Sequence, residues 1–209
     1  MKNILIFLFL LIQNFELFGQ DERPSFRKIS GPERWWAITH PFVAIKAKKI
    51  TKKALSATEW VMQDTTLDGD PSGGQVDAFR HAFWMALLAQ KMCWRKALRL
   101  GQAHEKGNYC DFKKGKMENG QLPDSMASVM DLFNNKEGAA IGCRNPQMPE
   151  DSLRQVVISS ILQGKMRIIL KNPEGKALTC DGIPIVWEKY KGCWQIPTCL
   201  VNSNFIKGK

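Results

Sequence analysis

The sequence lacks the short motifs that identify several large enzyme classes. It has no glycine-rich phosphate loop, no Rossmann fingerprint, no serine nucleophile elbow and no EF-hand calcium loop. None of its six cysteines forms a C-x-x-C pair, which is the spacing of zinc ribbons and thiol redox sites. Internal repeats and low-complexity segments are also absent. Any chemistry must therefore come from side chains that the fold brings together from separate segments.

Long hydrophobic runs are missing except at the N-terminus. There, Lys2 precedes an unbroken apolar run over residues 4–12, and Gly19 lies near the more polar exit. A run of this length is typical of a secretory signal peptide and is too short to span a bilayer comfortably. We therefore expect residues 1–20 to be a signal peptide and the mature protein to be periplasmic or secreted, without a membrane span. A retained anchor is the alternative.

The charge is strongly positive, with 30 Lys and Arg against 20 Asp and Glu and a net charge of +10. This balance favours an anionic partner, either an envelope component or a small substrate. Nucleic-acid binding would rest on charge alone, because no DNA- or RNA-binding motif is present, and we rank it last. Solvated lysine faces on helices are the plain alternative for each basic run.

The hydrophobic pattern predicts a mostly α-helical fold, with five to six helices in one domain over residues 30–164. Ser30 and Glu33 have the spacing of a capping box, and Pro41 should interrupt the helical pattern after His40.

Residues 165–209 form a small appendage in which the pattern changes. Residues 166–172 and 176–179 flank a Pro-Glu-Gly turn, which predicts a small hairpin. The irregular tail that follows has little core of its own, so we expect at least one disulfide among its cysteines. These are Cys180, Cys193 and Cys199.

Ionisable residues interrupt one of the most apolar stretches of the chain. The segment QVDAFRHAFWMALLAQ, residues 75–90, contains Asp77, Arg80 and His81 on a helix that is apolar on nearly every face. Such a helix is usually buried, and buried charges are costly unless paired, hydrogen-bonded or metal-bound. We expect these three side chains to meet partners from other helices.

Two further predicted helices carry short polar stripes that supply such partners. On one, His104 and Asn108 are one turn apart; on the other, Asp131 begins a stripe that continues through Asn134, Asn135 and Gly138. Convergent stripes on otherwise apolar helices predict one internal site.

The residue types of this expected cluster fit hydrolysis. A histidine could act as general base or metal ligand, aspartates could ligate or orient, and a guanidinium could hold a phosphate. The candidate catalytic residues are Arg80, His81, His104 and Glu105; the candidate ligands of a divalent metal such as zinc are Asp77, His81, His104 and Asp131; the candidate substrate-binding residues are Arg80, Asn134 and Asn135.

The structural alternative is a non-catalytic envelope-binding or scaffold domain whose polar network fixes helix register. Asn108 replaces the second histidine of an H-E-x-x-H motif, which argues against a zincin. His104 has no carboxylate one turn away on its own helix, so its replacement is expected to cost little stability.

Three segments in order, GGQVDAFRHAFWMALLAQ, LGQAHEKGNY and PDSMASVMDLFNNKEG, resemble a bacterial domain family of unknown function. The family is marked by an (N/D)-x-F-R-H-A helix, an A-H-E helix and an M-D-L-x-N-N helix, and the likeness covers about residues 35–145. The resemblance implies a kinship with exported proteins common in Bacteroidetes and with toxin-associated domains, and it favours hydrolysis.

Overall fold

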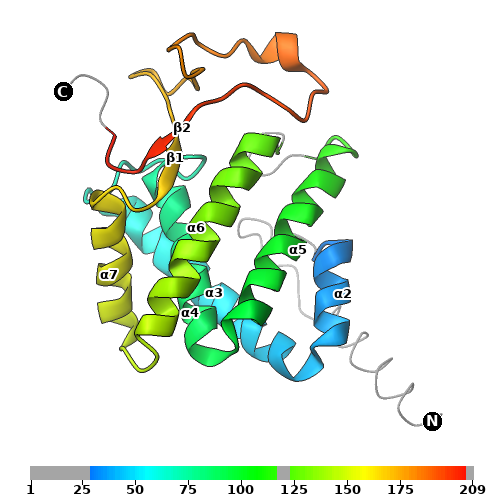
Figure 1. Cartoon of the computed structure of the whole chain (residues 1–209), viewed down its shortest axis with the longest axis vertical. Helices are drawn as coiled ribbons and strands as arrows, with labels where there is room; N and C mark the ends of the chain where they lie inside the picture. Colours follow the sequence, from blue (N-terminus) through cyan, green and yellow to red (C-terminus); the bar gives the residue numbers. More distant parts are fainter. Residues whose placement is uncertain (1–28, 117–122, 206–209) are drawn as a thin grey trace.

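The computed structural model describes residues 29–116 and 123–205, so the expected signal peptide lies outside the described residues. Figure 1 shows a bundle of helices with a small two-stranded sheet and an irregular tail at one end. The elements are α2 (Gly31–Thr39), α3 (Pro41–Gln63), α4 (Gln75–Lys91), α5 (Trp94–Phe112), α6 (Ser125–Arg144), α7 (Glu150–Leu162), β1 (Arg167–Ile169), a 3-10 turn η1 (Trp187–Tyr190) and β2 (Leu200–Asn202). The predicted mostly α-helical fold is confirmed. None of the described helices combines the length and the hydrophobicity of a membrane-spanning segment.

Helix α4 is the centre of the bundle. It packs against α3, α5, α6 and α7, and most of its residues are buried, including the ring pair of Phe79 and Phe83. Other helices surround α4 on several sides, so little of its surface faces solvent. Asp77 and His81 are therefore buried, as predicted.

Two glycines allow α6 to lie directly against α4. A Cβ atom on Gly138 would stand 2.1 Å from the backbone oxygen of Ala82, and one on Gly142 would stand 2.2 Å from that of Ala86. Any side chain at either position would therefore push the helices apart. The close approach brings the polar stripe of α6 against the polar residues of α4.

The helix starts follow the local sequence. Ser30 caps α2 in a reciprocal capping box with Glu33, and the chain breaks between α2 and α3 at His40-Pro41, as predicted. Asp124 caps α6 by accepting hydrogen bonds from the backbone of Met126 and Ala127.

The predicted small sheet is present, but its strands pair differently from expectation. β1 pairs antiparallel with β2, whereas the segment after the Pro-Glu-Gly turn forms only isolated bridges, Lys171 to Ala177 and Leu178 to Pro184. The reason is that Cys199 bonds through its backbone to both Leu170 and Leu178, which places the returning chain beside β1.

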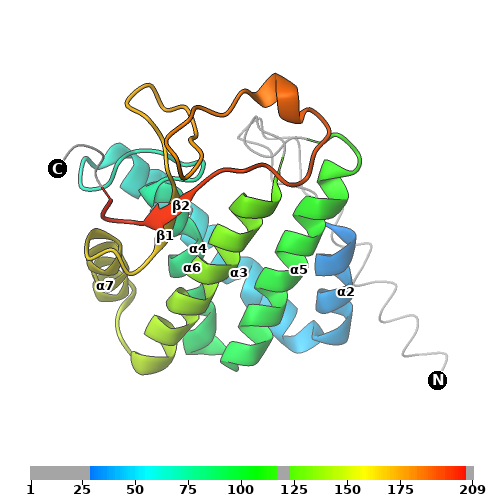
Figure 2. The same ribbon diagram turned by 45° about the horizontal axis from the view of Figure 1, so that its top comes forward.

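The tail is closed by a disulfide between Cys180 and Cys199, which confirms the expected bridge, while Cys193 is free and exposed. Figure 2 shows the tail crossing the ends of α5 and α6. The ring of Trp194 packs 4.9 Å from that of Tyr109, and its backbone oxygen accepts from Ser125 at the start of α6. The tail therefore covers the end of the bundle where α6 begins.

Candidate metal centre

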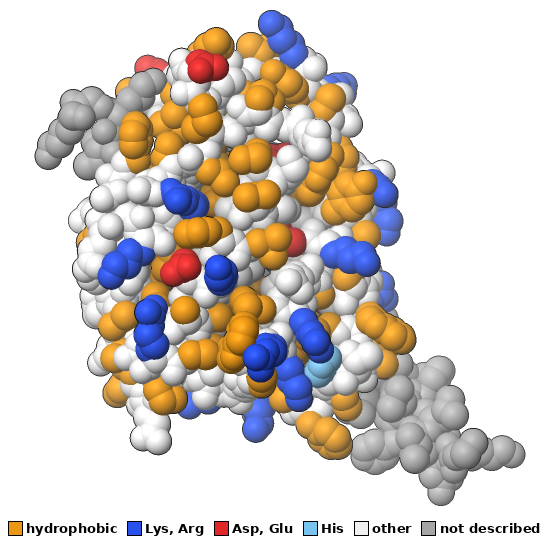
Figure 3. Space-filling view, viewed as in Figure 1, with side chains coloured by type: hydrophobic (Ala, Val, Ile, Leu, Met, Phe, Trp, Pro, Cys, Tyr) orange, Lys and Arg blue, Asp and Glu red, His pale blue; other side chains and the backbone are white. Residues whose placement is uncertain are grey.

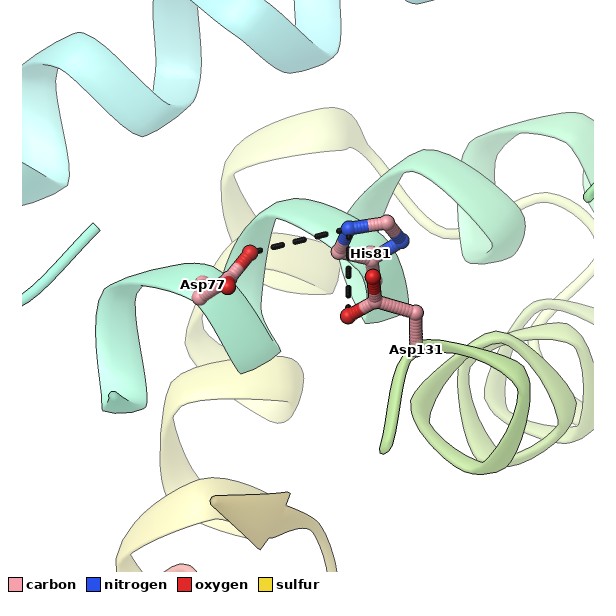
Figure 4. A group of neighbouring side chains, drawn as sticks. All are labelled: Asp77, His81 and Asp131. Atoms are coloured by element: carbon pink, nitrogen blue, oxygen red, sulfur yellow. Dashed lines mark ion pairs between the residues drawn. The ribbon is translucent and has the colours of Figure 1, made fainter. Parts of the chain in front are cut away.

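Three buried side chains from α4 and α6 meet near the start of both helices: Asp77, His81 and Asp131 (Figure 4). The Nε2 atom of His81 lies 3.3 Å from Oδ1 of Asp131 and 3.6 Å from Oδ1 of Asp77. One ligand atom from each residue lies within 4.8 Å of the other two. The spacing of Asp77 and His81 by one helical turn, with α6 held close, creates this convergence.

The two oxygens of Asp77 have different roles. Oδ2 accepts a hydrogen bond of 2.6 Å from the backbone N–H of Gly73, in the loop that precedes α4. Oδ1 turns towards His81 and Arg80. The loop and the positive end of the helix dipole thus stabilise the carboxylate and aim one oxygen at the cluster.

Arg80 completes the charge balance of the cluster. Its Nη2 lies 2.6 Å from Oδ1 of Asp77 and 3.2 Å from Nε2 of His81. The side chain is 22% exposed, whereas that of Asp77 is 8% exposed. Arg80 thus places one positive charge directly against Asp77 and beside His81.

His81 is held as a neutral imidazole. Burial lowers its pKa well below the usual value, the charges of Arg80 and His104 lower it further, and the neighbouring Asn135 raises it. A neutral ring has one N–H, so either Nε2 accepts from Arg80 or it donates to an aspartate. The other ring nitrogen, Nδ1, makes no well-formed hydrogen bond within the described chain, although the amide of Asn135 lies close enough to act on the pKa of the ring.

His104 is beside the cluster and not among its three potential ligands. Its ring centroid lies 6.1 Å from that of His81, and its Nδ1 lies 2.9 Å from Oε1 of Glu33 on α2. His104 has no carboxylate one turn away on its own helix, but Glu33 supplies one from α2, so a small stability cost for its replacement is no longer expected. Glu33 was recognised from the sequence only as a capping residue, and no spacing signal could link positions 71 residues apart.

The Glu33–His104 pair also affects titration. Burial raises the pKa of Glu33, but the hydrogen bond and charge of His104 together with the Ser30 contacts outweigh it and lower the pKa to about 2. Glu33 thus stabilises a positive charge on His104, and that charge helps to keep His81 neutral.

The remaining predicted site residues are buried but engaged in different ways. Asn108 donates a hydrogen bond of 3.1 Å to Oε2 of Glu105, both on α5. The amide of Asn134 binds the backbone N–H and C=O of Arg167, each at 2.9 Å, and so ties β1 to α6. Asn135 is buried beside His81, although neither of its amide atoms makes a well-formed hydrogen bond within the described chain.

A pocket lies beside this cluster at the end of the bundle that the tail covers. It has a cavity volume of about 100 Å³, and its lining includes Asp77, Arg80 and Asp131 together with Lys171 and Trp187 of the tail. Lys171 is held in place by an ion pair with Asp70 and a bond of 2.6 Å to the backbone oxygen of Ser72. No spacing pattern in the sequence points to these tail residues, because only the tertiary fold brings them to the pocket.

The donor set fits a divalent ion. Two carboxylate oxygens and one neutral imidazole nitrogen are ligands for Zn²⁺ and for other first-row divalent metals, and a catalytic ion needs three protein ligands plus an open position. The pocket supplies that open side, since Asp77 and Asp131 line it while remaining more than nine-tenths buried.

The fold and the site together define a helical domain with a buried Asp-His-Asp cluster. Residues 34–165 match the family described as Domain of unknown function (DUF6973), and the chain belongs to that family. No curated protein and no solved structure matches the chain.

Proposed function

We propose that this protein is an exported, metal-assisted hydrolase that acts on an anionic, phosphate-containing substrate. The observation that carries the proposal is the group Asp77, His81 and Asp131, whose ligand atoms lie within 4.8 Å of one another beside a pocket. The Cys180–Cys199 disulfide supports export, because such bonds persist in oxidising compartments.

In this proposal the protein supplies the ligands and the means to hold the substrate. When bound, a divalent metal lowers the pKa of its water and polarises a phosphoryl oxygen. Asp77 and Asp131 provide charge, and the lowered pKa of His81 keeps its nitrogen lone pair available at neutral pH. His104 acts through its charge on His81 and through Glu33, as a positioning residue.

Arg80 is the substrate-binding residue of the proposal. It is the most exposed member of the cluster and lines the pocket, so it presents a guanidinium to an anion that enters there. In the hydrolysis step the water oxygen bonds to phosphorus and the bond from phosphorus to the leaving oxygen breaks. One proton of the water ends on the leaving oxygen and the other stays on the phosphate product. The substrate is therefore a phosphate ester small enough, at its reacting end, for a cavity of about 100 Å³.

The test is hydrolysis of chromogenic phosphate monoesters and diesters by the purified protein, before and after chelation and with Zn²⁺ or Mn²⁺ restored. We expect turnover in the parent, loss in Asp131→Asn, and no loss in Asp151→Asn. Asp151 is a matched control because its side chain is 83% exposed and pairs with Arg154 on the surface. Turnover that is equal in the parent and Asp131→Asn would reject the assignment.

One observation favours a second function, a non-catalytic scaffold. Nη2 of Arg80 lies close enough to Asp77 and His81 to serve as the cation of the cluster itself. A structural network of this kind would bind no metal, and Asp131→Asn would lower stability without altering any activity. Metal content measured after purification without chelator separates the two functions.

A further inference from the structure

Large apolar side chains are exposed at the corner where α2 meets α3. Phe42 is 90% exposed, Trp35 68%, Ile45 57% and Ile38 46%. Four large apolar side chains within eleven consecutive residues exceed the scattered exposure that is normal for a surface and indicate an interaction site. Phe42 and Ile45 share one face of α3, because they are three residues apart.

The same segment carries positive charge and no negative charge. Between Glu33 and Glu59 there are six basic residues and no Asp or Glu. Lys46 and Lys49 follow Phe42 at positions i+4 and i+7, so they continue its exposed face along α3. We call Trp35, Ile38, Phe42, Ile45, Lys46 and Lys49 the corner patch.

The start of α5 adds to the same end of the molecule. The indole N–H of Trp36 donates to the backbone oxygen of Lys96, which ties α2 to the first turn of α5. That turn exposes Trp94, with the guanidinium of Arg95 4.8 Å from its ring centroid. Figure 3 shows blue side chains gathered with hydrophobic ones at the lower edge, where Figure 1 places this corner and the α4–α5 turn.

We propose that the corner patch docks this protein on an anionic lipid bilayer. Indole rings favour the headgroup level, aliphatic and phenyl side chains enter the acyl boundary, and lysines bind anionic headgroups. Ile38 and Ile45 favour lipid over a soluble polyanion, because aliphatic side chains gain nothing from phosphate or from a hydrated polymer. The charge complementarity follows from the absence of acidic residues across the segment.

Docking through the corner patch determines whether the pocket faces the bilayer or the aqueous side. The α4–α5 turn lies at the C-terminal end of α4, whereas Asp77 and the pocket lie at its N-terminal end. A helix of 17 residues is about 25 Å long. The pocket therefore faces away from the bilayer that holds the protein, and its substrate arrives from the aqueous side. This inference is independent of the proposed hydrolysis.

The test is sedimentation of the purified exported protein with vesicles of phosphatidylcholine alone and with phosphatidylglycerol added. We expect binding to the anionic vesicles that weakens with salt. Lys46→Glu with Lys49→Glu should weaken it at least about tenfold, since each lysine near an anionic surface contributes a factor of about five. Lys189→Glu with Lys191→Glu makes the same charge change on the exposed tail and should leave binding unchanged.

A second pair of variants tests the apolar contribution. Phe42→Ser with Ile45→Ser should also weaken binding, whereas Ile183→Ser with Val186→Ser, exposed on the tail, should not. Equal weakening by test and control pairs, or none, would overturn the proposal. So would self-association of the parent that Phe42→Ser abolishes, or binding of a DNA oligonucleotide that Phe42→Ser with Ile45→Ser leaves unchanged.

Discussion

Oε1 of Glu33 lies 2.9 Å from Nδ1 of His104, and this contact joins α2 to α5 beside the buried cluster. The other oxygen of Glu33 accepts from the backbone N–H of Ser30 at 2.8 Å. One carboxylate thus completes the helix cap and binds a histidine on another helix. Its loss would affect both the fold of α2 and the charge beside His81.

His104→Ala should lower the free energy of unfolding by about 1–3 kcal/mol, because it leaves a largely buried carboxylate without its charged partner. Urea unfolding of the parent and the variant measures the difference. Glu59→Gln, which alters an exposed acid elsewhere, serves as the control and should change stability by less than about 0.5 kcal/mol. An unchanged midpoint for His104→Ala would show that the pair contributes nothing.

The same pair predicts a pH dependence. The pKa of Glu33 is lowered from 4.5 to about 2 in the folded protein, so its contribution is complete above pH 4.5 and is lost as the pH falls towards 2. The parent should therefore lose stability relative to Glu33→Gln over that window, by up to about 3 kcal/mol. Unfolding free energies measured from pH 5 to pH 2 test this. Parallel curves would contradict the assignment.

Gly138→Ala should be strongly destabilising, by at least about 2 kcal/mol, because the added Cβ would meet the backbone oxygen of Ala82 at 2.1 Å. Backbone cannot move aside as a side chain can, so α6 must shift away from α4. Gly31→Ala is the matched control, since nothing lies within 4 Å of a Cβ there. Thermal denaturation compares the two, and similar melting temperatures would show that the helices are not in close contact.

Replacement of both Cys180 and Cys199 by serine should loosen the tail, at a cost of about 3 kcal/mol for a loop of this length. The sequence separation is 19 residues, and the bridged cysteine also anchors the chain beside β1. Hydrogen exchange should increase over residues 170–202 and remain unchanged in α4. Cys193→Ser is the control and should leave exchange in the tail unaltered.

Periodicity predicted the helices well because burial imposes it on the sequence. The apolar residues of α4 and the one-turn spacing of Asp77 and His81 are sufficient to predict a buried pair. Oδ1 of Asp131 lies 3.3 Å from Nε2 of His81 in that pair. What sequence could not provide was contact between distant segments. The pairing of β1 with β2 and the contact of His104 with Glu33 both depend on tertiary packing.

Asn134 shows that helical spacing predicts the direction of a side chain but not its role. Its helical position predicted that it would point inward, and it is fully buried. Its amide, however, hydrogen-bonds to the backbone of Arg167 and so connects α6 to β1. An inward direction alone does not distinguish such a residue from one that binds substrate. The distinction needs the identity of the neighbour, which helical spacing does not supply.

The most direct test of the metal centre is calorimetric titration of Zn²⁺ into the chelator-treated parent, Asp131→Asn and Asp151→Asn. Four free cysteines in the described chain are present in all three proteins, so any binding to thiols cancels in the comparison. We predict a site in the parent and in Asp151→Asn that is weakened at least about tenfold in Asp131→Asn. Equal zinc binding by all three proteins, or none by the parent, would contradict the metal centre.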